Sequence, residues 1–446
     1  MVNLLGTFDG MVVTVALPAI QSDLGLDPLS GQWIIGLHSL ALGSVLITAG
    51  RLGDKWGRRR CVISGLIVVA GGLTLAAVAP SPAFLFVARA LQGFGSGLAI
   101  PNIFGIVSSY PDAGVRTRTM AAIAVAGSSG SVLGGVVGGA LMQAGNWRLV
   151  FGAIVPVALG SAVLCLVSLP KDRPDRQSRA PGVVGAGLVF VAVLLTVQTI
   201  TSLSDLDSLS WTVLIFVVGT VGAWLAVVMH LRRSPNPIIA PRVLHVRSLQ
   251  AAALGMPGQV FAYQGSVYLC LLGFQEVYDW SPLKSGVAFA PLGLTCLLTS
   301  LVVSRIIKDR GWRRTTLISQ TLCTLGLFAI AASWLFGYGI AALGLALLGI
   351  GIAISAVTYN LAAGINIDTD DKATAYGFFE TSTHLAGAVV VAVLASSLAL
   401  SASLPTSAQF TVAFMVAGLG CISMTIASMV RDPREQVLYE ETRSSS

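Results

Sequence analysis

The chain has 446 residues, of which 54% are hydrophobic and only 11% are charged. Its mean hydropathy of +0.82 is far above that of an ordinary water-soluble domain, so the sequence is that of an integral membrane protein. The net charge of +7 does not indicate a nucleic-acid partner, because most basic residues lie in short connections between apolar runs.

The apolar runs predict an all-α membrane protein in the lipid bilayer. A helix needs about 20 mostly apolar residues to cross a hydrocarbon core roughly 30 Å thick. Fourteen runs meet this condition and predict fourteen transmembrane helices. They lie at residues 1–20, 32–52, 61–79, 83–108, 119–143, 148–169, 181–201, 211–230, 249–275, 284–306, 315–336, 340–362, 373–400 and 408–430.

The basic residues predict the orientation of these helices. Loops that stay in the cytoplasm keep an excess of Lys and Arg. Nearly all of the 27 basic residues lie in alternate connections or in the C-terminal tail; the exceptions are Arg89, Arg148 and Lys284. We therefore expect a multi-pass protein of the cytoplasmic membrane with both termini in the cytoplasm.

Two similar loops suggest an internal repeat. GRLGDKWGRRR at residues 50–60 and SRIIKDRGWRR at residues 304–314 share a basic residue, an Asp, a Gly and an Arg pair. Two parallel six-helix repeats would place these loops at equivalent positions. We therefore predict an N-terminal six-helix bundle at 1–169, a linker with two extra transmembrane helices at 170–248, a C-terminal six-helix bundle at 249–430 and a cytoplasmic tail at 431–446.

Four motifs follow one another along the chain. FDGMVVTVALP carries Asp9 in the first run, GRLGDKWGRRR follows the second, ARALQGFGSG carries Arg89 and Gln92 in the fourth, and GSSGSVLGGVVGGAL lies in the fifth. In these motifs the chain resembles the major facilitator superfamily, in its fourteen-span drug:proton antiporter branch. The resemblance implies alternating access and a secondary transporter rather than an enzyme, with protons and a small molecule as partners and no cofactor or metal.

An acid and a base lie deep in predicted helices. Asp9 is about 12 Å into its run at 1.5 Å per residue, where a carboxylate costs roughly 2.5–3.5 kcal/mol. It should therefore face the bundle interior. We expect Asp9 to carry the coupled proton, a structural acid being the alternative. Arg89 keeps its charge and needs an acceptor, for which Asp9 is the candidate; it either tunes that acid or forms a fixed salt bridge.

Further polar residues are candidates for proton coupling or substrate binding. Glu380 and His384 are spaced i, i+4 and share one helix face. They suit a second proton site or recognition of a cationic substrate, and a local hydrogen bond is the alternative. The resemblance implies Asn and Gln there, so the pair departs from the branch. Candidates that line a substrate cavity, or form interhelical hydrogen bonds instead, are His38, Tyr263, Gln264, Tyr268, Tyr359 and Asn360.

Two groups of residues are candidates for conformational gating. In the loop after the second run, glycines permit a tight turn and Asp54 can pair with Arg58 or Arg59. The loop either gates the two access states or only sets topology; its residues are Gly50, Asp54, Gly57, Arg58 and Arg59. In the fifth run, small residues four apart allow close helix packing, with or without a role in gating: Gly130, Gly134 and Gly138 on one face, and Gly135 and Gly139 on another.

The predicted function is proton-driven efflux of small amphipathic or cationic organic compounds by a protein that acts as a monomer. One alternative is a dedicated exporter of an endogenous metabolite such as an antibiotic, a siderophore or an amino acid. The other is a membrane sensor without transport, against which the motifs around Asp9, Asp54 and Arg89 argue.

Overall fold

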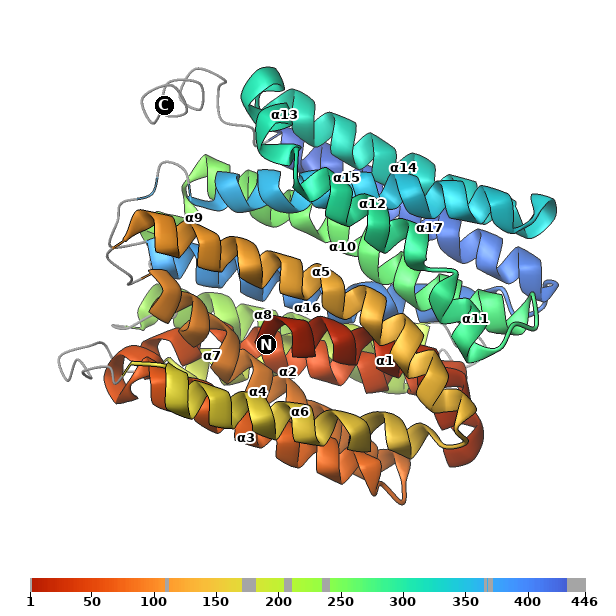
Figure 1. The fold of residues 1–446 in the computed structure, drawn as a ribbon, viewed down its shortest axis with the longest axis horizontal. Helices are drawn as coiled ribbons and strands as arrows, with labels where there is room; N and C mark the ends of the chain where they lie inside the picture. Colours follow the sequence, from red (N-terminus) through yellow and green to blue (C-terminus); the bar gives the residue numbers. More distant parts are fainter. Residues whose placement is uncertain are drawn as a thin grey trace.

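The computed structural model describes residues 2–108, 112–170, 182–203, 211–234, 241–364, 367 and 372–430, whose regular secondary structure is entirely helical (Figure 1). The long helices lie side by side along one direction. In chain order they are α1 (Val2–Leu24), α2 (Pro28–Trp56), α3 (Arg58–Ala77), α4 (Pro82–Ser108), α5 (Ala113–Gln143), α6 (Trp147–Ser168), α7 (Val183–Leu203), α8 (Trp211–Arg233), α9 (Pro241–Leu244), α10 (Arg247–Glu276), α11 (Pro282–Val287), α12 (Ala290–Ser300), α13 (Val303–Arg310), α14 (Trp312–Phe336), α15 (Tyr338–Gly364), α16 (Lys372–Leu400) and α17 (Thr406–Val430).

Thirteen of the predicted apolar runs each coincide with one helix, so the all-α prediction is confirmed. Several helices extend beyond their apolar run because polar residues continue or cap them. The start of α2 is an example: the side chain of Asp27 accepts a hydrogen bond from the backbone N–H of Ser30 at 2.8 Å. This N-cap satisfies one of the donors that a helix start leaves unpaired.

The run at 284–306 is interrupted and is not one continuous helix, although the stretch Pro282–Ser300 is long and apolar enough to cross a membrane. It forms three short helices, α11, α12 and α13. Pro291 lies in the first turn of α12. N–H groups in a first turn have no partner within the helix, so the missing N–H of proline removes no helical hydrogen bond there. Its ring could not continue the preceding helix, so a new helix begins around it.

Twelve stretches in the described ranges are long and apolar enough to cross a membrane, and one of them, Pro282–Ser300, contains both α11 and α12. α10 is not among them, although it coincides with a predicted run. Most of its residues from Ser248 to Phe274 are buried among other helices, so it packs inside the protein and needs no continuous apolar face. In α5, only the segment Leu133–Gln143 qualifies, as a shorter apolar helix within the described part of the chain.

The helices form two groups, here called the N-terminal half (α1–α6) and the C-terminal half (α10–α17). The halves contact each other mainly through α2 against α16 and through α5 against α11. A glycine with positive φ joins the second and third long segments of each half: Gly57 (φ 103°) between α2 and α3, and Gly311 (φ 75°) between α13 and α14. Residues other than glycine rarely adopt this backbone conformation. It occurs once in each of the two loops whose sequences suggested an internal repeat.

The contacts of α5 with the C-terminal half lie at one end of the bundle, whereas α2 and α16 also meet towards the other end, where Ile47 lies beside Gly377. We call the end where α2 meets α3 the basic end, because Arg58, Arg59 and Arg60 lie there. α5 begins at the basic end and meets α11 at the other, far end. Towards the basic end, α5 diverges from α13 (Figure 1). The structure is thus closed between α5 and α11 at the far end only.

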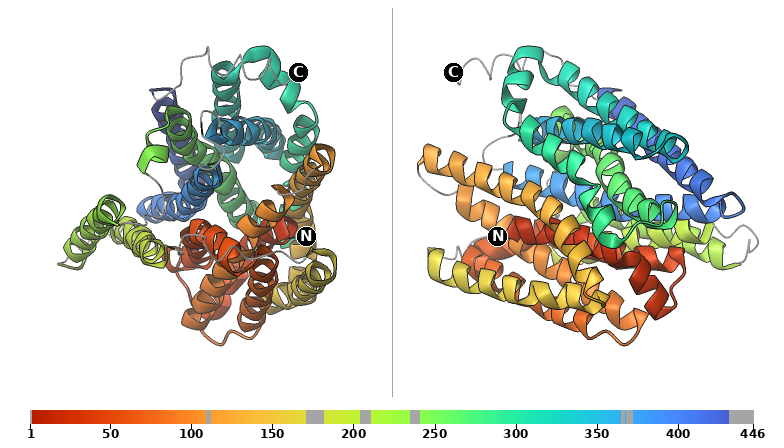
Figure 2. Two further views of the ribbon diagram at one scale, coloured as in Figure 1. Left: turned by 90° about the vertical axis from the view of Figure 1, so that its left-hand side faces the viewer. Right: turned by 45° about the vertical axis from the view of Figure 1, so that its right-hand side comes forward.

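The inserted helices α7 and α8 lie at the edge of the molecule, to one side of the two halves (Figure 2). α7 contacts α2 and α16, one helix from each half. The side-chain amide of Gln32 on α2 donates a hydrogen bond to the hydroxyl of Thr201 on α7 at 2.8 Å. Helix α7, with α8 packed on it, therefore covers the line along which α2 and α16 meet.

Candidate functional site

Asp9 and Arg89 form an ion pair inside the N-terminal half. Arg89 Nη1 on α4 lies 2.7 Å from Asp9 Oδ2 on α1, and the two side chains are only 1% and 8% exposed. The contact expected from the sequence is therefore present. A charge so deep in an apolar bundle is stable only with an opposite charge and hydrogen bonds around it.

Arg89 is held by two further acceptors. Its Nε donates to the backbone carbonyl of Ile34 on α2 at 2.7 Å, and its Nη1 donates to Oε1 of Gln92, one turn further along α4. The pair is less complete on the other side, because Asp9 Oδ1 is buried without a hydrogen-bond partner. One carboxylate oxygen is thus fixed and the other is free to bind a proton or a donor.

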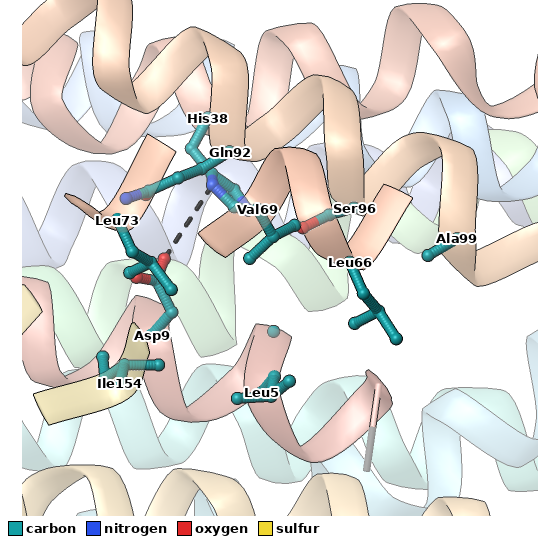
Figure 3. Close-up of a pocket in the computed structure, with 11 residues that line it drawn as sticks. Leu5, Asp9, His38, Leu66, Val69, Leu73, Gln92, Ser96, Ala99 and Ile154 are labelled. Carbon is teal, nitrogen blue, oxygen red and sulfur yellow. Dashed lines mark ion pairs between the residues drawn. The ribbon is translucent and has the colours of Figure 1, made fainter. Parts of the chain in front are cut away.

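A small cavity adjoins this pair. It is lined by residues of α1, α2, α3, α4 and α6, and its polar members are Asp9, His38, Gln92 and Ser96 (Figure 3). His38 Nδ1 lies 3.8 Å from Asp9 Oδ2. The sequence placed His38 among the substrate candidates, whereas here its imidazole points to Asp9 inside the N-terminal half.

Glu380 and His384 lie on α16, in the C-terminal half. His384 Nε2 is 3.9 Å from Glu380 Oε2, so the predicted i, i+4 neighbours do face each other. Their side chains are 40% and 31% exposed, although α16 packs against both α2 and α10. The two groups are therefore partly accessible although their helix packs against two others, and partial access is what a substrate contact requires.

A layer of polar groups surrounds this pair. A Cβ on Gly387 of α16 would lie 3.6 Å from the amide nitrogen of Gln264 on α10 and 3.8 Å from the hydroxyl of Ser39 on α2. A Cβ on Gly43 of α2 would lie 3.1 Å from the Cβ of His384. Gln264 thus belongs to the same layer as the Glu380–His384 pair, where α2, α10 and α16 meet. The partly buried Tyr263 is its chain neighbour on α10.

Three other substrate candidates are placed differently. Tyr268 and Tyr359 are 2% and 0% exposed, within the core of the C-terminal half. The hydroxyl of Tyr359 accepts a hydrogen bond from Nε2 of Gln320 at 2.9 Å, and Asn360 donates to the carbonyl of Ala356 in its own helix. For Tyr359 the structure has the interhelical hydrogen bond that the sequence left open as the alternative.

The loop between α2 and α3 forms a local ion pair. Asp54 Oδ1 lies 2.9 Å from Arg58 Nη2, and Arg58 Nε also donates to it at 3.0 Å. Gly57 makes the turn with its positive φ. Arg59 donates to the carbonyl of Leu166 on α6. Gly50 has open space where its Cβ would be, so the turn does not explain that glycine.

Asn102 on α4 ties this loop region to α2, and sequence reasoning missed it. Its Nδ2 donates to the carbonyls of Ala49 and Leu98 at 2.9 and 2.8 Å. A Cβ on Gly53 would lie 1.6 Å from Asn102 Oδ1, so a larger residue at this position would displace the Asn102 side chain. The signal available in the sequence was an Asn after Pro101 in an otherwise apolar run.

The two glycine faces of α5 contact different partners. Gly130, Gly134 and Gly138 face α1: a Cβ on Gly134 would lie 2.8 Å from the carbonyl oxygen of Phe8 and from the Cβ of Met11. This contact lies within the N-terminal half and supports the helix that carries Asp9.

The second glycine face of α5 contacts the C-terminal half. A Cβ on Gly139 would lie 2.5 Å from Cα of Leu283, and a Cβ on Gly135 would lie 3.0 Å from the carbonyl oxygen of Gly286. Both partners belong to α11. Since α5 and α11 come from different halves, this backbone contact is what closes the far end.

Comparison with known proteins decides the family. A family model described as Major Facilitator Superfamily matches residues 1–391. The chain belongs to the major facilitator superfamily. It is therefore a multi-pass membrane transporter and not an enzyme, as its motifs indicate. Its curated relatives include drug- and antibiotic-resistance proteins, which agrees with the branch that the motifs resemble.

Three relatives illustrate this. The puromycin resistance protein pur8 of Streptomyces alboniger is 31% identical over 329 residues, 72% of this chain and 63% of the relative. The cephamycin export protein CmcT of Amycolatopsis lactamdurans is 32% identical over 68% of this chain and 63% of its own length. The chain thus spans less than two thirds of these two proteins. The lincomycin resistance protein of Streptomyces lincolnensis is 28% identical over 97% of this chain and 89% of the relative.

Solved structures agree on the fold. A peptide transporter of the POT family in complex with sulfate superimposes with a TM-score of 0.69 at 18% identity, covering 98% of this chain and 94% of that one. At this identity the likeness concerns the arrangement of helices and carries no information on the substrate.

Proposed function

We propose that this transporter exports small amphipathic or cationic organic compounds in exchange for protons. The observation that carries the proposal is the buried Asp9–Arg89 pair, in which one carboxylate oxygen is bound and the other has no hydrogen-bond partner. A carboxylate kept at this depth against a cost of roughly 2.5–3.5 kcal/mol is a group with a function.

In this mechanism Asp9 binds a proton in one access state and releases it in the other. Proton binding neutralises the carboxylate and weakens its attraction to Arg89, which then relies on Ile34 and Gln92 as acceptors. Because Asp9 and Arg89 lie on different helices, the change alters the packing of α1 against α4. Each proton that moves down a potential of 100 mV supplies about 2.3 kcal/mol.

Alternating access moves the two halves against each other. The closed contact of Gly135 and Gly139 with α11 opens at the far end, and the diverging helices at the basic end come together. The loop with Asp54 and Arg58 acts as the gate at the basic end, which the distribution of Lys and Arg assigns to the cytoplasm. Both termini then lie in the cytoplasm, and one chain suffices for transport.

The substrate binds in the layer around Glu380 and His384. A carboxylate that is 40% exposed inside a membrane protein attracts a cationic group, and Gln264 from α10 offers a neutral hydrogen-bonding side chain next to Gly387, about one turn beyond His384 on α16. The relatives that are named for resistance to or export of antibiotics support organic compounds as the substrate class.

Reconstitution tests this function. Liposomes that contain the wild-type protein or Asp9→Asn are loaded with ethidium, a cationic dye, and an imposed pH gradient drives the exchange. We expect gradient-dependent dye movement by the wild type and a rate lower by about tenfold or more in Asp9→Asn. Equal movement with no gradient, or normal coupling in the variant, would contradict the proposal.

A dedicated exporter of one antibiotic is the second candidate. It is favoured by the names of three relatives, each of which refers to a single compound: puromycin, cephamycin or lincomycin. Competition distinguishes the two functions. Broad efflux predicts that chemically unrelated cations inhibit the transport of one another, whereas transport by a dedicated exporter should not be inhibited by them.

A further inference from the structure

The cavity beside Asp9 belongs entirely to the N-terminal half. Its lining residues come from α1, α2, α3, α4 and α6, and none comes from α16, which carries Glu380 and His384. Along α1 it extends from Asp9 back to Gly6 and Leu5, and along α4 from Gln92 to Ser96 and Ala99 (Figure 3). Both helices run in these directions towards the basic end.

Three buried polar atoms of the lining residues have no hydrogen-bond partner: Asp9 Oδ1, His38 Nδ1 and Gln92 Nε2. An unpaired buried polar group costs about 1–3 kcal/mol. A single molecule in the cavity that forms hydrogen bonds with all three groups would remove this cost. A single water can donate to Asp9 and His38 and accept from Gln92. Two to four polar partners are what a buried water needs.

We propose that this cavity is the proton route of the transporter: it holds water that links Asp9 to His38, and the substrate takes a separate path between the halves. The proposal rests on the proposed proton exchange and adds to it the route and a second proton-binding group. The proton leaves the carboxyl oxygen of Asp9 for the water, which passes one of its own protons to His38 Nδ1. The reverse transfer restores both groups.

The surroundings of His38 suit this role. The charged and titratable groups that face it are Asp9 from α1, Arg89 from α4 and His384 from α16. The imidazole lies 3.8 Å from the Asp9 carboxylate, so one water between the two groups can carry a proton from either to the other. His384 lies across the α2–α16 contact, on the proposed substrate side.

A side chain that fills the cavity tests the route. Gly6 lines the cavity, and its added Cβ would meet nothing within 4 Å, so a side chain can begin there and Gly6→Leu adds bulk at the cavity wall. Gly10 is the matched control, because it lies on the same helix, also has open space and does not line the cavity. We expect Gly6→Leu to lower pH-gradient-driven ethidium movement by about tenfold, while Gly10→Leu retains it.

Dye-for-dye counterflow without a pH gradient provides the second measurement, because it needs no proton turnover. Gly6→Leu should keep wild-type counterflow. If Gly6→Leu couples normally, or if both variants lose coupling alike, the proposed route is wrong. If the wild type shows counterflow but no response to the pH gradient, the proposed proton exchange itself fails, and the route fails with it.

Substitutions of two histidines distinguish the proton route from the substrate path. His38→Gln should shift or flatten the dependence of gradient-driven transport on pH and leave the KM for ethidium unchanged. His384→Gln should raise the KM and leave the shape of the pH profile unchanged. The opposite assignment of the two effects, or an unaltered pH profile in His38→Gln, would overturn the role of His38.

Discussion

Arg89 and Asp9 are joined by a 2.7 Å ion pair that uses only one of the two carboxylate oxygens of Asp9. Arg89 also reaches Ile34 and Gln92, so it has acceptors that persist when Asp9 is neutral. This asymmetry supports the coupling role that we propose for the pair. An arginine that serves only Asp9 would leave a buried, unpaired cation each time the acid takes up a proton.

Arg89→Gln should lose both stability and transport. Removing one partner of a buried ion pair costs about 3–5 kcal/mol, because the other charge stays buried alone. We expect a lower midpoint of thermal unfolding in detergent and a loss of gradient-driven dye movement. The measurements are the unfolding midpoint and transport in liposomes.

The double variant Asp9→Asn with Arg89→Gln separates structure from coupling. It leaves no unpaired charge, so much of the stability lost in Arg89→Gln should return. Transport driven by a pH gradient should stay absent. Recovery of coupled transport in the double variant would show that the pair is structural only.

The two glycine faces of α5 should respond differently to alanine. Gly134→Ala forces a Cβ against the backbone of α1 within the N-terminal half, so it should lower the unfolding midpoint. Gly139→Ala forces a Cβ against Leu283 of α11, and separation of the halves relieves that clash. We expect it to open the far end, measured as a longer distance between spin labels at Ala140 and Val287, both of which are exposed.

Gly160→Ala is the control for both glycine variants. Gly160 lies on α6 with nothing within 4 Å of its added Cβ. Alanine favours helix by about 1 kcal/mol over glycine, so this variant should be neutral or slightly more stable. An unchanged label distance in Gly139→Ala would contradict the assignment of this face to closure of the halves.

Glu380→Gln should change substrate binding more than proton coupling. The half-exposed carboxylate on α16 attracts a cation, and glutamine keeps its shape without its charge. We expect the KM for ethidium to rise by about tenfold, with little effect on an uncharged substrate of similar size. An equal effect on charged and uncharged compounds would mean that Glu380 does not recognise the cation.

Asp27 gives a pH-dependent contribution to stability at the start of α2. Partial burial by itself raises the pKa of this carboxyl, but hydrogen bonds from Ser30 and Leu29 outweigh it and hold the pKa below its ordinary value. The charged form thus stabilises the folded state, and its contribution is lost as pH falls through the folded-state pKa.

Asp27→Ala should accordingly lower stability by about 0.5–2 kcal/mol near neutral pH, with a smaller difference from the wild type in acid. The measurement is the unfolding midpoint of both proteins at several pH values. A difference that stays constant down to the acid range would contradict this account of the cap.

Hydropathy and motifs predicted most of the fold, because a bilayer imposes long apolar runs and a Lys and Arg bias on any sequence that crosses it. The exception, α11–α13, shows the limit. Pro291 marks the first interruption and could have been used. The second, at Leu301 and Val302, has no proline or glycine, so no local signal was available in the sequence.

The part of the candidate site that could be predicted is the ion pair, because a buried charge needs an oppositely charged partner. A buried Arg89 needs an acid, and Asp9 was the acid at similar depth. The neighbours of His38 were not predictable, because spacing along one helix does not say which other helix its face will meet. Likewise, the spacing of Gly135 and Gly139 predicted a close contact, but only the fold identifies α11 as the partner.

Proton release on substrate binding tests the role of Asp9 most directly. The enthalpy of ethidium binding to the purified protein, measured in buffers with different ionisation enthalpies, gives the number of protons released. Exchange of a proton for substrate predicts about one proton released per dye by the wild type and none by Asp9→Asn. The same release from wild type and Asp9→Asn would contradict the assignment of Asp9 as the proton carrier.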